Sequence, residues 1–124
     1  MSGTSVFNVA FDCADPYQLA QFWSAVTGRP VNGQDRPGDP EADISLGNGV
    51  NLFFQRVPET KTVKNRVHVC LRPDEPRDAE VERVVGLGAT VLADHRGEHD
   101  GGWMVLADPE GNEFCMLHHQ LGRS

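Results

Sequence analysis

The sequence predicts an α+β protein built from two copies of one strand–helix–strands unit. The first observation is an internal repeat, in which the segment from Asn8 to Pro16 recurs 60 residues later as the segment from His68 to Pro76. The second is a turn at 47–49 that recurs at 109–111, an offset of 62, each time before a strand-like run. A regular repeat describes the architecture of a chain before any motif is interpreted. We therefore expect two modules that share a core and face a common cleft.

The first half starts with a strand and a helix. Residues 6–13 alternate apolar side chains with mixed ones, which is typical of a strand with one buried face. Asp15 stands where an N-cap belongs, and Pro16 where a first helical residue belongs. Apolar side chains between 19 and 26 recur at spacings of three and four residues, which predicts an amphipathic helix. Gly28 is expected to end it.

A loop and a hairpin complete the first half. Residues 32–41 are rich in turn formers and charge, which predicts a mobile loop. Short strands are expected at 42–46 and 50–57 around Gly47-Asn48-Gly49, a good hairpin signal. The polar segment 58–64 connects the two halves.

The second half repeats this plan. A strand is expected at 66–72, and Asp74 or Glu75 is expected to cap a helix that Pro76 opens and Gly88 ends. The remaining segments are predicted as a strand, a loop and a closing hairpin, at 89–93, 94–102, 103–108 and 112–118.

Composition limits the classes of partner. With 124 residues, 39% of them hydrophobic and 23% charged, the chain has the size and content of one globular domain. A net charge of −7 without a basic run argues against nucleic acid and anionic membranes. We see no apolar run of about 20 residues and expect no secretory signal. Three cysteines cannot all pair within one chain, so we expect reduced thiols in the cytoplasm.

Alternation assigns one face of each half-sheet to the helix. The covered faces are predicted to carry Phe7, Val9, Phe11, Leu52 and Phe54, then Val67, Val69, Leu71, Phe114 and Met116. The uncovered faces are predicted to carry Asn8, Ala10, Asp12, Asn51, Phe53 and Gln55, then His68, Cys70, Arg72, Glu113, Cys115 and Leu117. Polar and aromatic groups on an uncovered, curved sheet are typical of a small-molecule cleft, although a solvated sheet face alternates in the same way. The predicted ligand-binding residues are Asn8, Asp12, Asn51, Phe53, Gln55, Cys70, Arg72, Trp103 and Cys115.

Several motifs carry a family resemblance. The most specific is Asp-Pro-Glu-Gly-Asn-Glu-Phe at 108–114, preceded by Gly-Gly-Trp at 101–103. With Asp15-Pro16, Phe22-Trp23 and the segment 66–71, the chain resembles the vicinal oxygen chelate superfamily, in its glyoxalase-like and bleomycin-resistance branch. The resemblance covers residues 5–118. It implies one domain of two βαβββ modules, at 5–58 and 65–118, with an open concave sheet and frequent homodimers.

The resemblance also implies where metal-dependent relatives hold their ligands. The matching positions here are Asn8, Phe53, His68 and Cys115, with Gln55 as the alternative to Phe53. A phenylalanine has no lone pair, and catalytic sites normally have about three protein ligands. We therefore predict no metal and no cofactor, and His68 is the only place where a divalent ion could be held.

The candidate catalytic residues are His68 and Glu113. Histidine titrates near neutral pH, so His68 could act as general acid or base or only line the pocket. Glu113 could be its partner, or could form a salt bridge at the rim with a residue such as Arg72. Cys115 as a nucleophile needs a depressed pKa. Together His68, Cys70 and Cys115 would suit a soft metal such as zinc, but cysteines often pack as small apolar groups.

The leading hypothesis is a cytoplasmic protein that binds a small organic metabolite in the cleft, with metal-independent isomerase or lyase chemistry. The alternative is a non-catalytic protein of bleomycin-resistance type that sequesters an antibiotic or metabolite, and a charge of −7 would attract a cationic drug. We expect a homodimer and no nucleic-acid or membrane partner.

Overall fold

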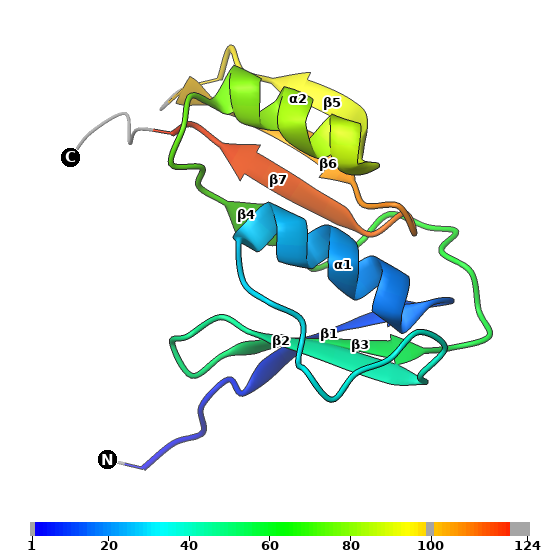
Figure 1. The fold of residues 1–124 in the computed structure, drawn as a ribbon. Helices are drawn as coiled ribbons and strands as arrows, with labels where there is room; N and C mark the ends of the chain where they lie inside the picture. The colour runs from blue at the N-terminus through cyan, green and yellow to red at the C-terminus, as the bar shows by residue number, and fades with distance from the viewer. Residues whose placement is uncertain (1, 99–100, 120–124) are drawn as a thin grey trace. The chain divides into compact units, whose positions relative to one another are not determined.

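The structure is a computed structural model that describes residues 2–98 and 101–119. It contains two mixed sheets and two helices, which confirms the predicted α+β class. The chain divides into two compact units, and the boundary lies between Thr60 and Lys61 (Figure 1). The assignment of both modules to a single domain stays a prediction.

The first unit consists of β1 (Asn8–Cys13), α1 (Pro16–Thr27), β2 (Glu41–Ser45) and β3 (Asn51–Arg56). Its strand order is β1-β3-β2, with β1 parallel to β3 and β2 antiparallel to it. A fourth strand, which the βαβββ plan implies, is reduced here to one bridge between Val31 and Ile44. Prolines and glycines are frequent in the loop before β2, and proline cannot donate to a ladder.

The predicted signals of α1 are confirmed. The Asp15 side chain accepts a hydrogen bond from the Gln18 N–H at 3.2 Å. Gly28 ends the helix at φ 73°, a left-handed conformation that glycine adopts without a side-chain clash. Because both ends have these defined partners, the sequence located this helix to within a residue.

Aromatic side chains form the core of the first unit. Trp23 and Phe54 are fully buried, and the Phe11 ring lies 5.2 Å from Trp23 and 5.1 Å from Phe54. These contacts join α1 to the predicted covered face. Phe7 was expected on that face, but it is 70% exposed, because it precedes β1 and has no place in the pleat.

The second unit consists of β4 (Val69–Leu71), α2 (Arg77–Leu87), β5 (Thr90–His95), β6 (Trp103–Ala107) and β7 (Glu113–Leu117). Its strand order is β4-β7-β6-β5, with β4 parallel to β7 and the other neighbours antiparallel. A register shift interrupts the β5–β6 ladder between Val91 and Ala93. This unit has the full βαβββ plan.

The start of α2 differs from the prediction. Neither Asp74 nor Glu75 caps it, since Pro76 occupies the N-cap position without a side-chain cap bond. The Arg77 N–H instead donates to Nδ1 of His119 at 3.2 Å, and the buried Arg77 guanidinium donates to the carbonyls of Gly101 and Gly102. Residues remote in sequence thus replace the local cap.

The core of the second unit lies between α2 and the covered sheet face. Val84 of α2 and Leu106, Phe114 and Met116 of the sheet are almost completely buried. Val67 was predicted on this face, but it is 82% exposed and precedes β4. Among the described residues, neither helix has the length and apolar character needed to cross a membrane.

Candidate functional site

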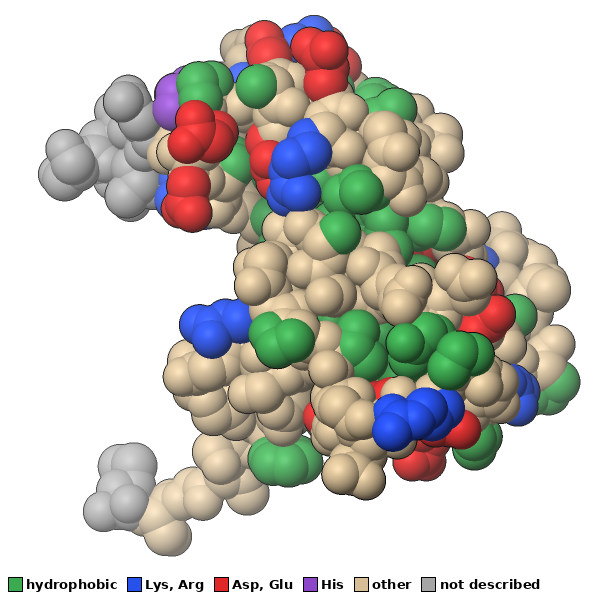
Figure 2. Space-filling model, viewed as in Figure 1, with side chains coloured by type: hydrophobic (Ala, Val, Ile, Leu, Met, Phe, Trp, Pro, Cys, Tyr) green, Lys and Arg blue, Asp and Glu red, His purple; other side chains and the backbone are tan. Residues whose placement is uncertain are grey.

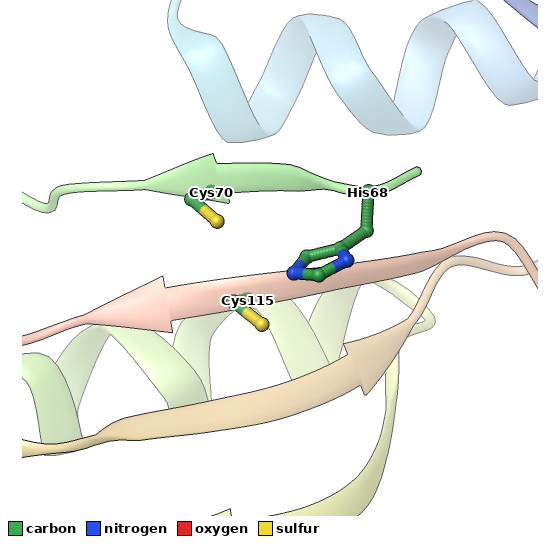
Figure 3. A group of neighbouring side chains, drawn as sticks. All are labelled: His68, Cys70 and Cys115. Carbon is green, nitrogen blue, oxygen red and sulfur yellow. The ribbon is translucent and has the colours of Figure 1, made fainter. Parts of the chain in front are cut away.

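His68, Cys70 and Cys115 lie together on the uncovered face of the second unit (Figure 3). Cys70 of β4 stands directly opposite Cys115 in the parallel ladder with β7. His68 precedes Cys70 by two residues, the spacing that returns a side chain to the same face. The candidate ligand atoms of the three side chains all lie within 4.8 Å of one another. The predicted side-chain alternation therefore brings these three residues together.

Burial distinguishes Cys115 from its two neighbours. Cys115 is only 5% exposed as a residue, whereas His68 and Cys70 are exposed. Burial raises the pKa of the Cys115 thiol to about 11, and the nearby Cys70 thiol acts in the same direction. At neutral pH Cys115 is thus protonated, so it lacks the depressed pKa that a nucleophilic cysteine requires.

Glu113 is held by lysines. Its carboxylate contacts Lys64 Nζ at 2.8 Å and Lys61 Nζ at 3.3 Å, and it accepts a hydrogen bond from the Asn65 N–H at 3.3 Å. The hydrogen bond from Lys64 is the largest of the effects that lower the pKa of Glu113, against an opposing effect of burial. The salt bridge weighed for Glu113 is therefore present, but Arg72 is not the partner, since Arg72 donates to the His118 carbonyl at 2.9 Å.

Trp103 belongs to the same face. It stands opposite Leu117 in the β6–β7 ladder and opposite His95 in the β5–β6 ladder. The His95 and Trp103 rings stack with centroids 4.8 Å apart and an interplanar angle of 19°. The indole is half-buried, so part of its ring remains accessible to a ligand.

The uncovered face of the first unit has an apolar centre between polar pairs. The half-buried Phe53 stands opposite Ala10 in the β1–β3 ladder. On one side of it, Gln55 Nε2 donates to Asp12 Oδ1 at 2.8 Å. On the other side, Asn8 stands opposite Asn51, and Nδ2 of Asn51 donates to the Phe7 carbonyl at 3.4 Å. The predicted binding residues of this half therefore share one face, and two of them already bond each other.

Strand registers relate the two faces residue by residue. Ala10 pairs with Phe53 in the first unit, as Cys70 pairs with Cys115 in the second, which reproduces the offsets of 60 and 62 in the sequence repeat. Phe53, not Gln55, is thus the equivalent of Cys115. The four family ligand positions then hold an amide, a phenyl ring, an imidazole and a thiol, a set that does not suit a family-type divalent metal site.

Sequence reasoning missed the lysines around Glu113. Lys61, Lys64 and Asn65 lie in the segment before β4, about 50 residues from Glu113 in the chain. No local pattern marks such a contact, because it depends on how the segment runs beside β7. Stacking of His95 on Trp103 was missed for a similar reason, since β5 continues to His95 instead of ending at residue 93.

Comparisons with solved structures agree with this fold. A glyoxalase/bleomycin resistance protein/dioxygenase family enzyme from Burkholderia phytofirmans PsJN superposes with a TM-score of 0.72 at 19% identity, covering 91% of this chain and 97% of its own. The fosfomycin resistance protein FosX from Mesorhizobium loti gives 0.65 at 16% identity, with 97% and 93% covered. FosX from Listeria monocytogenes, solved with Mn(II) and 1S,2S-dihydroxypropylphosphonic acid, gives 0.69 at 15% identity, with 95% and 91% covered.

At these identities the structural comparisons show the fold alone. No curated protein matches the sequence. The sequence profile described as "Glyoxalase-like domain" matches residues 8–117, nearly the whole chain and both units. The chain therefore belongs to the glyoxalase-like domain family.

Proposed function

We propose that the chain binds a small organic molecule on the sheet faces that its helices leave uncovered. The observation that carries this proposal is the mixture of groups on those faces. In the first unit the half-buried Phe53 shares its face with Asn8 and Asn51. In the second unit the half-buried Trp103 shares its face with the exposed His68. Ligand sites commonly combine an apolar surface with a few polar groups that orient the ligand. A molecule with a flat apolar part and several oxygen atoms fits this chemistry.

The structural neighbours support the same class of ligand. FosX from Listeria monocytogenes was solved with a small phosphonic acid, and the Mesorhizobium loti protein is named for resistance to an antibiotic. The names of both neighbours therefore connect this fold with small organic molecules. Because a fold hosts many functions, the ligand of this chain has to be argued from its own residues.

The direct test is a thermal-shift screen against metabolites and antibiotics, followed by fluorescence titration of each hit. The chain has two tryptophans; Trp23 is fully buried and Trp103 is half-buried. A ligand on the uncovered face of the second unit should change the Trp103 emission, and a ligand on either face should raise the melting temperature by mass action.

Two variants and one control sharpen this test. Trp103→Phe should weaken binding of a hit on the uncovered face of the second unit, and Phe53→Ala should weaken binding of a hit on the uncovered face of the first. Val63→Ala should weaken neither, since Val63 is 73% exposed and lies outside every strand. Equal affinity in all three variants would place the ligand elsewhere and refute the proposal.

Isomerase or lyase chemistry at His68 is a second candidate. His68 is exposed, and the structure gives its imidazole no hydrogen-bond partner among the described residues, so the ring is available to a substrate. An enzyme would return a changed compound, and His68→Ala would abolish the change. A sequestering protein would return the compound unaltered in both cases.

We further propose a homodimer located in the cytoplasm. Four large apolar side chains of α2 and β5 remain exposed at 39–51%, and they are Val85, Leu87, Val91 and Leu92. Exposed apolar side chains often mark interfaces where they form a contiguous patch. None of the three cysteines forms a disulfide, in keeping with a reducing compartment.

A further inference from the structure

Within the described part of the chain, the second unit has a set of metal-donor groups that the first unit lacks. His68, Cys70 and Cys115 supply an imidazole and two sulfur atoms. At the equivalent positions of the first unit, the strand registers place Asn8, Ala10 and Phe53. The same framework therefore presents two uncovered faces, and only one of them carries the donors.

The separations are close to those of a coordinated ion. Zinc binds sulfur at about 2.3 Å and imidazole nitrogen at about 2.0–2.1 Å, so donors around a tetrahedral ion lie roughly 3.5–3.8 Å apart. The three donor atoms here lie within 4.8 Å of one another. His68 and Cys70 are exposed and free to turn about their side-chain torsions, while the buried Cys115 gives the site one fixed ligand. Figure 3 shows the three side chains on the same side of β4 and β7.

The donor types select the kind of metal. Thiolate and imidazole together suit zinc and other soft ions, whereas magnesium, calcium and manganese prefer oxygen. The nearest carboxylate on this face of β7, that of Glu113, is bound to Lys61 and Lys64. The set of one nitrogen and two sulfur atoms therefore differs from the oxygen-rich sites that magnesium, calcium and manganese prefer.

We propose that His68, Cys70 and Cys115 bind one zinc ion in an open site with three protein ligands. Each thiol loses its proton to the solvent as its sulfur bonds to the ion, and the imidazole binds in its neutral form. Three protein ligands leave a fourth position for water or for a donor atom of a ligand. This inference goes beyond organic-ligand binding and rests on the second unit alone.

The experiment uses the full chain, reduced and freed of metal. Zinc affinity is measured by competition with a chromophoric chelator, and Co²⁺ serves as a spectroscopic substitute. We expect one ion per chain, a rise in melting temperature, and a cobalt spectrum with tetrahedral d–d bands and thiolate-to-metal charge transfer. Calorimetry in buffers of different ionisation enthalpy should count two thiol protons released, as the reaction requires.

Variants identify the ligands. His68→Ala, Cys70→Ala and Cys115→Ala should each weaken zinc binding by about tenfold or more. Cys13→Ala is the matched control, because Cys13 is a buried cysteine of the first unit outside any disulfide, and it should leave both affinity and charge-transfer intensity unchanged. If Cys115→Ala fails to fold, the zinc affinities of His68→Ala and Cys70→Ala still test the site, because both residues are exposed.

Several results would overturn the site. These are no zinc binding at micromolar concentrations, an octahedral cobalt spectrum without charge transfer, or an affinity that Cys13→Ala lowers as much as Cys70→Ala does. Organic-ligand binding is measured separately, with a chelator present, by comparing the affinity of Phe53→Ala with that of the wild type. A failed zinc experiment therefore leaves the proposed ligand binding standing, and the reverse also holds.

Discussion

At the scale of single residues, Glu113 shows how neighbours decide the chemistry of a carboxylate. Two lysine ammonium groups and the Asn65 N–H surround it, and its side chain is 10% exposed. These partners favour the charged form, so the pKa of Glu113 is lowered. A carboxylate held in this way is suited to anchoring the segment before β4 and is a poor proton donor at neutral pH.

Glu113→Gln should lower stability near neutral pH by less than about 1 kcal/mol, since the lysines are partly exposed. Because the folded-state pKa is below the ordinary value, the contribution of Glu113 is present above that ordinary value and disappears as the pH falls through the folded-state pKa. Urea denaturation of wild type and variant across the acid range measures this. The two midpoints should converge in acid, and Glu59→Gln, at an exposed position, should show no such dependence. A constant difference at every pH would contradict the role of the ion pairs.

At the scale of elements, the two helices begin in different ways. α1 has a local cap from Asp15, whereas α2 has no side-chain cap and its Arg77 N–H donates to His119 at the far end of the unit. The same Asp-Pro or Glu-Pro signal precedes both helices in the sequence. A local cap depends only on the residues at the helix start. The hydrogen bond to His119 depends on the direction that the chain takes after β7.

Asp15→Ala should destabilise the protein by about 1 kcal/mol, the usual cost of losing an N-cap. Asp74→Ala should change stability by much less, because no side chain caps α2. Thermal or urea denaturation of both variants measures the difference. Equal losses would mean that Asp74 stabilises α2 in a way the structure does not show.

The two faces of β3 can be separated by adjacent substitutions. Phe54 is fully buried beside Phe11, whereas Phe53 is half-buried on the uncovered face. Phe54→Ala should cost about 3–5 kcal/mol, as is usual for a core phenylalanine, and Phe53→Ala should cost clearly less. Denaturation midpoints measure both, and similar costs would mean that the face of Phe53 is packed as tightly as the core.

At the scale of the whole molecule, the surface combines charge with exposed apolar groups. Figure 2 shows acidic and basic side chains interspersed with hydrophobic ones over α2. Glu80 and Arg83 form an ion pair there at 2.7 Å, while Val85 and Leu87 are exposed at the end of the helix. A mixed surface keeps the chain hydrated, and its apolar part is available to a partner.

A homodimer should show a mass near twice 13.6 kDa by size-exclusion chromatography with light scattering. If the apolar residues of α2 and β5 form its interface, Leu87→Glu with Leu92→Glu should shift the mass to the monomer, since buried unpaired charges are costly. The double variant should keep the wild-type circular dichroism. A wild-type monomer at all concentrations would refute the dimer, and an unaffected dimer would place its interface elsewhere.

Much of the fold could be read from the sequence. The period of two in the strands and the stripe of α1 with its Asp15 cap depend on near neighbours in the chain, so local patterns report them. The offsets of 60 and 62 come from comparing the two halves of the sequence, and the strand registers reproduce them. The same alternation placed His68, Cys70 and Cys115 on one face. It failed for Phe7 and Val67, which precede β1 and β4 and are 70% and 82% exposed instead of covered.

Local order along the chain thus determined the elements, their faces and the family of this protein. Tertiary structure alone decided that two lysines form ion pairs with Glu113 and that His119 accepts the hydrogen bond at the start of α2. It also decided that the donor atoms of His68, Cys70 and Cys115 come within 4.8 Å of one another. The physical reason is that each of these contacts joins segments more than 40 residues apart. Their distances depend on strand register and on the course of connecting segments, neither of which a local pattern encodes.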